Sequence, residues 1–107
     1  MEATLNTIFE ALSHQKRRGM ITTLAYRPAT VSQLADEQGL SLPAIHKHLR
    51  LMEQAELIQR KKVGRTNFVA INRDGMKQAQ NWMMQFNTSW GTNQETLENY
   101  ISGLKDR

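Results

Sequence analysis

Cationic side chains gather in one part of the chain, where they could bind phosphate groups or the edges of nucleic-acid bases. Residues 41–73 carry seven Lys and Arg against two Asp and Glu, whereas the rest of the 107-residue chain has no basic excess. The cations most able to make such contacts are Lys47, Arg50, Lys61, Lys62 and Arg65. A positive charge confined to one region is the electrostatic signature of nucleic-acid binding.

Lys47 and Arg50 belong to a stretch in which apolar residues recur with the spacing of an amphipathic helix, at about 100° per residue. The apolar residues that share one face are Ile45, Leu49 and Met52. The residues on the other side and its flank are Pro43, His46, Lys47 and Arg50. Such a helix suits the major groove, where its N-terminal residues can meet base edges. A solvated helix face is the alternative, because two exposed basic residues are common on surface helices.

The residues before this helix predict a second helix and a tight turn. Thr30 stands three residues before Gln33, which is the spacing of a capping box. Gly39 follows as a residue that tolerates positive φ, and Ser41 can cap the next helix, with Pro43 in its first turn. Two short helices across a glycine turn are typical of a helix-turn-helix. An ordinary helical hairpin inside a core is the alternative.

The residues after it predict a β-hairpin at 57–71, with its turn at Gly64. Lys61, Lys62 and Arg65 would flank that turn, where they could hold phosphates or enter a minor groove. A charged hairpin that only protects an edge strand is the alternative. A basic hairpin directly after a basic helix favours DNA binding.

Helices are also predicted at both ends, at residues 3–12, 15–26 and 75–104, and Gly91 could kink or break the last one. Arg17 and Arg18, in the polar stretch 13–18 that connects the first two helices, fit a solvated turn or an internal salt bridge better than a phosphate contact. Apolar and aromatic residues on the terminal helices suggest pairing with a second copy. These residues are Leu5, Ile8, Phe9, Trp82, Phe86, Trp90, Leu97 and Ile101. Packing within one subunit is the alternative.

Length, composition and motifs together exclude several other classes of function. The length fits a single domain, residues 1–107, with a reading motif at 30–54 and a wing at 57–71. There are no cysteines, and His46 and His48 point about 200° apart on a helix, so neither a metal site nor a cofactor is expected. No catalytic constellation, signal peptide or membrane span is evident, so we expect a cytoplasmic protein that is not an enzyme.

These stretches together resemble the arsenical-resistance-type (ArsR) family of winged helix-turn-helix repressors, and the resemblance covers residues 8–101. The motifs that carry it are VSQLA at 31–35, LSLPAIHKHL at 40–49, AELI at 55–58 and Gly64-Arg65 at the wing turn. Pro43-Ala44 and the tail aromatics are similar to a subgroup without metal ligands. The fold implied is mainly α with a small β-hairpin, with N- and C-terminal helices forming a dimer interface.

The resemblance implies a homodimer on a pseudo-palindromic operator, usually one that controls the repressor's own operon. By position, the residues implied to read bases are Leu42, Pro43, His46 and Lys47. Those implied to contact the DNA backbone are Ser41, Arg50, Lys61, Lys62 and Arg65.

The chain departs from the family pattern at four places. His14-Gln15 replaces a usual Asp-Pro, and Val69 replaces a common wing aromatic. Glu56 replaces a glycine, so that turn is expected to be strained or differently shaped. His46 replaces a common serine, which should change the base preference.

The sequence therefore predicts a sequence-specific DNA-binding transcriptional regulator, acting as a dimeric repressor of its own operon. Its partners would be double-stranded DNA and a second copy of the chain, with no membrane. Two alternatives stay open: a winged-helix module that docks another protein through its aromatic C-terminal helix, and a regulator that responds to a small molecule held there. The charge excess favours nucleic acid over the first alternative.

Overall fold

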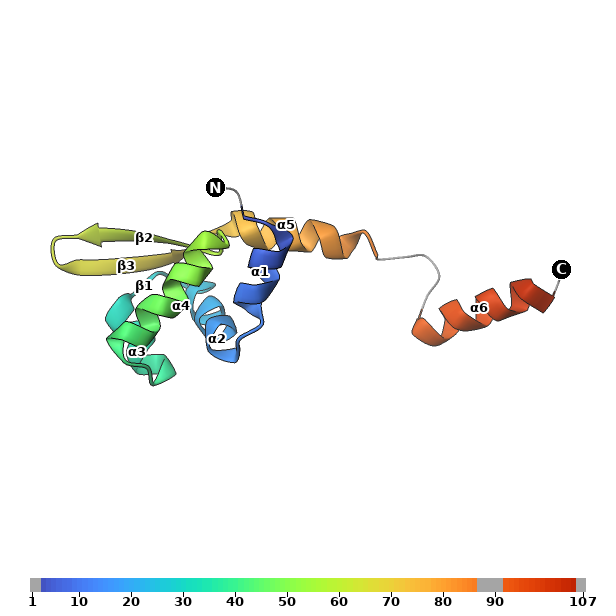
Figure 1. Cartoon of the computed structure of the whole chain (residues 1–107), viewed down its shortest axis with the longest axis horizontal. Helices are drawn as coiled ribbons and strands as arrows, with labels where there is room; N and C mark the ends of the chain where they lie inside the picture. Colours follow the sequence, from blue (N-terminus) through green and yellow to red (C-terminus); the bar gives the residue numbers. More distant parts are fainter. Residues whose placement is uncertain (1–2, 87–91, 106–107) are drawn as a thin grey trace.

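The computed structural model describes residues 3–86 and 92–105, which form six helices and one three-stranded antiparallel sheet (Figure 1). In chain order the elements are α1 (Leu5–Leu12), α2 (Gln15–Leu24), β1 (Ala29–Thr30), α3 (Val31–Gln38), α4 (Leu42–Gln54), β2 (Ile58–Val63), β3 (Thr66–Ile71), α5 (Arg73–Met84) and α6 (Asn93–Lys105). The β2–β3 hairpin projects from one side of the body formed by α1–α5, and α6 lies apart from that body (Figure 1). The predicted fold class, mainly α with a small hairpin, is confirmed.

The helix-turn-helix is built by the local signals that predicted it. The Thr30 hydroxyl accepts from the Gln33 amide at 3.1 Å, and the Gln33 side chain accepts from the Thr30 amide at 2.9 Å. Gly39 ends α3 with φ +65°, a conformation that glycine adopts without strain. Ser41 caps α4, and Pro43 lies in its first turn. These contacts fix the angle at which α4 leaves α3.

Two clusters of buried apolar residues hold the body together. The larger joins α2, α3, α4 and the sheet, and consists of Met20, Leu24, Ala29, Val31, Leu34, Ala35, Ile45, Leu49, Met52, Ile58 and Val69. The smaller lies under α1 and α5, and consists of Ala3, Ile8, Ala11, Ala55, Leu57 and Ala79. The larger cluster includes three residues of α4, and the smaller includes its C-cap residue Ala55, so both depend on the position of this helix.

The sheet has the order β1-β3-β2, with Thr30 opposite Phe68 and Arg60 opposite Val69. Gly64 turns the hairpin with φ +61°, as predicted. Strand β1 was not predicted, because two residues are too few to show an alternating pattern. It pairs the start of the helix-turn-helix with strand β3 of the wing.

The N-terminal helices begin and end close to the predicted ranges of 3–12 and 15–26. Thr4 caps α1, so that helix begins at Leu5. His14 caps α2 through its Nδ1, which accepts from the Lys16 amide at 3.1 Å. His14 therefore has a local structural role at the position where the family pattern has another residue.

The turn between α4 and β2 contains backbone strain, as expected from the missing glycine. Glu56 has φ +55°, a region that costs a residue with a side chain roughly 1–2 kcal/mol. The Gly75 amide of α5 donates to the Glu56 carbonyl at 2.9 Å. A Cβ on Gly75 would lie 2.2 Å from the Ala55 carbonyl oxygen, so only glycine lets α5 approach this turn.

The C-terminal segment differs from the single helix predicted at 75–104. Helix α5 ends at Met84, so Phe86 lies beyond it rather than on its face, and a separate helix α6 begins at Asn93. Thr92 and Glu95 cap the N-terminus of α6. The Thr92 amide donates to the Glu95 carboxylate at 2.9 Å, and the Glu95 amide donates to the Thr92 hydroxyl at 3.2 Å. The question of continuity at Gly91, and the position of Trp90, lie outside the described residues. Among the described helices, none has the length and apolar character required to cross a lipid bilayer.

Replacing Gly75 with alanine should lower the free energy of unfolding by about 1–3 kcal/mol, because the new methyl group has to displace backbone atoms. Urea unfolding followed by circular dichroism measures this change. The matched control is Gly103→Ala in α6, where a Cβ meets no atom within 4 Å. There, alanine should leave stability unchanged or raise it by up to about 1 kcal/mol. Equal effects of the two substitutions on stability would contradict the close approach of α5 to the turn between α4 and β2.

Candidate nucleic-acid interface

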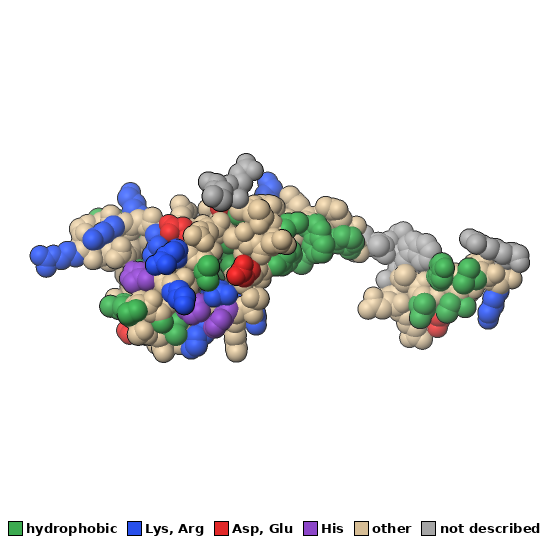
Figure 2. Space-filling model, viewed as in Figure 1, with side chains coloured by type: hydrophobic (Ala, Val, Ile, Leu, Met, Phe, Trp, Pro, Cys, Tyr) green, Lys and Arg blue, Asp and Glu red, His purple; other side chains and the backbone are tan. Residues whose placement is uncertain are grey.

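Helix α4 buries one face and exposes the other, as its spacing predicted. Ile45, Leu49 and Met52 are fully buried. The residues that stay exposed are Leu42, Pro43, Lys47 and Arg50, while His46 is half-buried. Figure 2 shows Lys and Arg side chains spread over the wing and the adjoining part of the body. The four predicted base-reading side chains therefore project from the solvent-facing side of α4.

The wing carries two kinds of basic residue. Lys61, Lys62 and Arg65 are exposed and available for phosphate contacts. Arg60 instead turns toward α4, where its Nη2 forms a 3.0 Å salt bridge with Glu53. Its Nη1 also lies 3.4 Å from Nδ1 of His46. The charge of Arg60 is thus largely used within the protein, and this residue was not among the predicted contacts.

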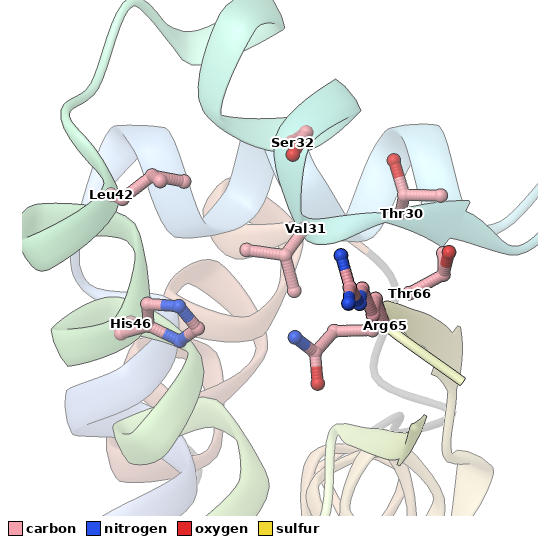
Figure 3. Close-up of a pocket in the computed structure, with 8 residues that line it drawn as sticks. Thr30, Val31, Ser32, Leu42, His46, Arg65 and Thr66 are labelled. Carbon is pink, nitrogen blue, oxygen red and sulfur yellow. The ribbon is translucent and has the colours of Figure 1, made fainter. Parts of the chain in front are cut away.

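A cavity of about 330 Å³ lies between the start of α3, the start of α4 and the wing (Figure 3). We call it the helix–wing cavity; its lining residues are Thr30, Val31, Ser32, Leu42, His46, Arg65, Thr66 and Asn67. Hydroxyl, amide, imidazole and guanidinium groups dominate this lining. It brings together Leu42, His46 and Arg65, three predicted site residues from two different elements. Groups of this kind donate hydrogen bonds to phosphate oxygens.

Arg17 is buried, with 7% of its surface exposed, and is not a solvated residue or part of a salt bridge as predicted. Its Nε donates to the Ala11 carbonyl at 2.7 Å, and its Nη2 donates to the Glu10 carbonyl at 3.1 Å. Its Nη1 lies 2.9 Å from Nδ1 of His48 on α4. The guanidinium therefore joins the end of α1 to α4, and its acceptors compensate for its burial.

His48 is held in place by this network. Burial lowers the pKa of His48 below its ordinary value of 6.5, and the neighbouring His14 and Arg17 lower it further. The rings of His14 and His48 pack edge to face with centroids 4.7 Å apart. Because guanidinium groups only donate, Nδ1 of His48 accepts from Arg17 and the imidazole is neutral.

The histidines of α4 face different partners, His46 toward Arg60 and His48 toward Arg17. Within residues 3–86 and 92–105, no three His, Asp or Glu side chains are grouped so that they could hold a metal ion.

An exposed apolar area lies on α1 and the end of α5, on the side of the body away from the wing (Figure 2). We call it the aromatic surface; it consists of Phe9, Trp82, Met83, Met84 and Phe86. The ring centroids of Phe9 and Trp82 are 5.7 Å apart, and those of Trp82 and Phe86 are 4.9 Å apart. Both ring pairs are edge to face, and each of the three aromatic side chains is more than a third exposed.

Two further interface candidates lie closer to the interior. Leu5 is half-buried. Ile8 is fully buried in the chain's own core, so it has no surface left for a partner and its assignment to the interface is wrong. The spacing of α1 could not distinguish Ile8 from Phe9, because neighbouring residues of a helix are only about 100° apart.

Comparisons with known proteins agree on the class of this protein. A family described as a helix-turn-helix domain matches residues 12–60. A solved ArsR family transcriptional regulator, RHA00566, is 33% identical and aligns with a TM-score of 0.72 over 79% of this chain and 91% of its own. The transcriptional repressor SdpR of Bacillus subtilis is 29% identical over 82 residues, which cover 77% of this chain and 91% of SdpR.

A third relative matches in fold. The homodimeric winged helix-turn-helix DNA-binding domain Mb0332 of Mycobacterium bovis aligns with a TM-score of 0.62 at 17% identity, over 77% of each chain. The fold and the charged face define a winged helix-turn-helix DNA-binding protein. The chain belongs to the ArsR family and is a DNA-binding transcriptional regulator, not an enzyme.

Acid should destabilise the protein through His48. Its folded-state pKa is lowered, so the unfolded chain binds this proton more readily than the folded chain. The stability that neutral His48 contributes is present above about pH 6.5 and is lost as the pH falls through the lowered folded-state pKa. We expect the Tm to fall more between about pH 7.5 and about pH 5.5 than in His48→Asn, whose amide oxygen can still accept from Arg17.

Differential scanning fluorimetry across this range measures the difference. An equal fall in the Tm of both proteins would show that His48 is not held neutral.

Proposed function

We propose that the protein is a dimeric repressor that binds a pseudo-palindromic operator upstream of its own operon. The observation that carries the proposal is the placement of exposed cations on two elements, α4 and the adjoining wing. Lys47 and Arg50 stand on α4, and Lys61, Lys62 and Arg65 stand on the wing. The relative SdpR is named a transcriptional repressor, which supports repression as the outcome.

The contacts divide between bases and backbone. With α4 in the major groove, Leu42, Pro43, His46 and Lys47 would meet base edges, since they occupy its first turns. The backbone contacts would come from Ser41, Arg50, Lys61, Lys62 and Arg65. A DNA phosphate would lie on the wing side of the helix–wing cavity, beside Arg65 and the Thr66 hydroxyl, while His46 on the α4 side would face a base edge.

The aromatic surface would be the centre of the dimer interface. Exposed aromatic side chains that stack together are typical of surfaces buried between subunits. Helix α6 has a second exposed apolar side, made of Leu97, Tyr100, Ile101 and Leu104, which would extend this interface. Mb0332, which shares the fold, is named as homodimeric. Two copies would place two α4 helices in successive major grooves, one helical turn apart.

The first experiment is fluorescence anisotropy with DNA from upstream of the protein's gene, compared with a scrambled duplex at several salt concentrations. A repressor of its own operon should prefer the native duplex and bind with two chains per site. Affinity should fall steeply with salt, because phosphate contacts release counterions. Equal affinity for both duplexes, with equal salt slopes, would overturn the proposal of an operator in this DNA.

Lys47→Ala and Arg65→Ala should weaken operator binding in different ways. Loss of a base contact at Lys47 should reduce discrimination against the wrong base by about 1–3 kcal/mol. Loss of a phosphate contact at Arg65 should weaken binding to every duplex alike and reduce the salt slope by about 1. Anisotropy on the operator and the scrambled duplex measures both effects.

Arg27→Ala is the control for charge, because Arg27 is exposed and lies outside the proposed contacts. It should change operator affinity far less than Arg65→Ala. Uniform loss of affinity from Lys47→Ala on all sequences would count against its base-reading role.

Trp82→Ala should weaken the dimer, because a central aromatic residue of an interface typically contributes about 2 kcal/mol or more. Sedimentation equilibrium at several concentrations measures the change, with circular dichroism to verify folding. Tyr26→Ala is the control, since Tyr26 is an exposed aromatic residue outside the aromatic surface. A dimer unchanged by Trp82→Ala, or a wild-type protein that stays monomeric, would refute this interface.

A further inference from the structure

His46 leaves α4 toward the wing, and Figure 3 shows its ring at the edge of the helix–wing cavity. One ring nitrogen, Nδ1, lies 3.4 Å from Nη1 of Arg60 on β2. The same side chain lines the cavity in which the proposed function places DNA. His46 therefore has one side occupied by the protein and another open to a ligand.

Arg60 is itself held in place by a second residue of α4. Its Nε and Nη2 donate to the same carboxylate oxygen of Glu53, at 3.3 and 3.0 Å. Glu53 follows His46 by seven residues, two turns along the same side of the helix. The guanidinium thus bridges two points of α4, and a planar group held at three of its nitrogens has little freedom to rotate.

The chemistry of guanidinium decides the state of the imidazole. Arginine has N–H donors and no acceptor, so the Nδ1 that faces it must offer a lone pair. A neutral imidazole carries one proton, which is then on Nε2. We infer that Arg60 is a positioning residue that fixes His46 as the Nε2–H tautomer, so that His46 reads a hydrogen-bond acceptor on the major-groove edge of a base.

The proton on Nε2 narrows the choice of base. Guanine presents two acceptors in the major groove, N7 and O6; adenine and thymine present one each, N7 and O4; cytosine presents only an amino donor. A donor from His46 therefore disfavours cytosine at the base it meets, and guanine offers it the most acceptors. This inference rests on the proposed function, since it requires α4 to lie in the major groove of an operator. Arg60, a wing residue that need not touch DNA, would then set the base preference of α4.

The tautomer can be tested without DNA. Long-range ¹H–¹⁵N spectra of the neutral imidazole distinguish protonated from unprotonated ring nitrogens. Wild-type protein should show His46 with a protonated Nε2 and an unprotonated Nδ1, and Arg60→Met should show a mixture of tautomers. Lys61→Met removes the same charge from the next residue of β2 and should leave the His46 signals unchanged. A mixture in the wild type, or no change in Arg60→Met, overturns the positioning role.

Base preference is tested by selecting bound duplexes from a randomised pool and sequencing them. Wild-type protein should prefer guanine over cytosine at one position in each half-site by about 5-fold, the lower end of the range for a base contact, because His46 supplies one donor rather than a bidentate pair. His46→Leu should abolish that preference, and Arg60→Met should reduce it. The double variant should lose no more than His46→Leu, since Arg60 acts through His46. Lys61→Met should weaken binding without changing the preferred base.

Substitution of 7-deazaguanine at the selected position should weaken the wild type and not His46→Leu, if N7 is the acceptor; an unchanged affinity would assign the contact to O6. Uniform loss of affinity from His46→Leu on all sequences would mean that Nε2–H meets a phosphate, and would overturn the inference while leaving operator binding intact. Failure of the wild type to select any sequence would instead refute the proposed function, with the NMR result still deciding the tautomer. Circular dichroism of each variant verifies that it is folded.

Discussion

The burial of one face of α4 is the constraint on which the rest of the structure depends. Ile45, Leu49 and Met52 are fully buried, and removing each from water stabilises the fold by about 1.5–3 kcal/mol. Rotating the helix by one residue, about 100°, would expose this face, so α4 has one favourable orientation. That orientation turns Lys47 and Arg50 outward. The cationic surface is therefore a consequence of how the core packs.

Two arginine side chains then fix features of α4 that apolar packing alone does not determine. Arg17 from α2 contacts His48 on one flank of α4, and Arg60 from β2 contacts His46 on another. Each arginine also binds a second group, carbonyl oxygens at the end of α1 for the first and a carboxylate of α4 for the second. Because directional bonds at several nitrogens tolerate little displacement, these contacts fix the axial position and side-chain states of α4.

The parts that could be predicted from sequence are those encoded within a few residues. The capping box at Thr30 and the glycine turns at Gly39 and Gly64 each specify their own backbone. The two arginine–histidine contacts could not be predicted, because they join residues 31 and 14 positions apart and depend on how elements pack. A basic residue looks the same in sequence whether it faces solvent or a buried acceptor. A break was considered only at Gly91, and the end of α5 at Met84 was missed because the apolar spacing continues beyond the helix.

The strained turn at Glu56 lies between α4, which is proposed to contact the DNA bases, and α5, which is proposed to form the dimer interface. It follows α4 directly, and its carbonyl accepts from Gly75 at the start of α5, whose other end carries Trp82. In a dimer that pairs through α5, the separation of the two α4 helices is set by this joint. Half-sites are spaced by the DNA helical repeat of about 34–36 Å, so a change at the joint would misplace one α4 relative to its groove. In the proposed dimer, Glu56 and Gly75 would therefore affect operator affinity without contacting DNA.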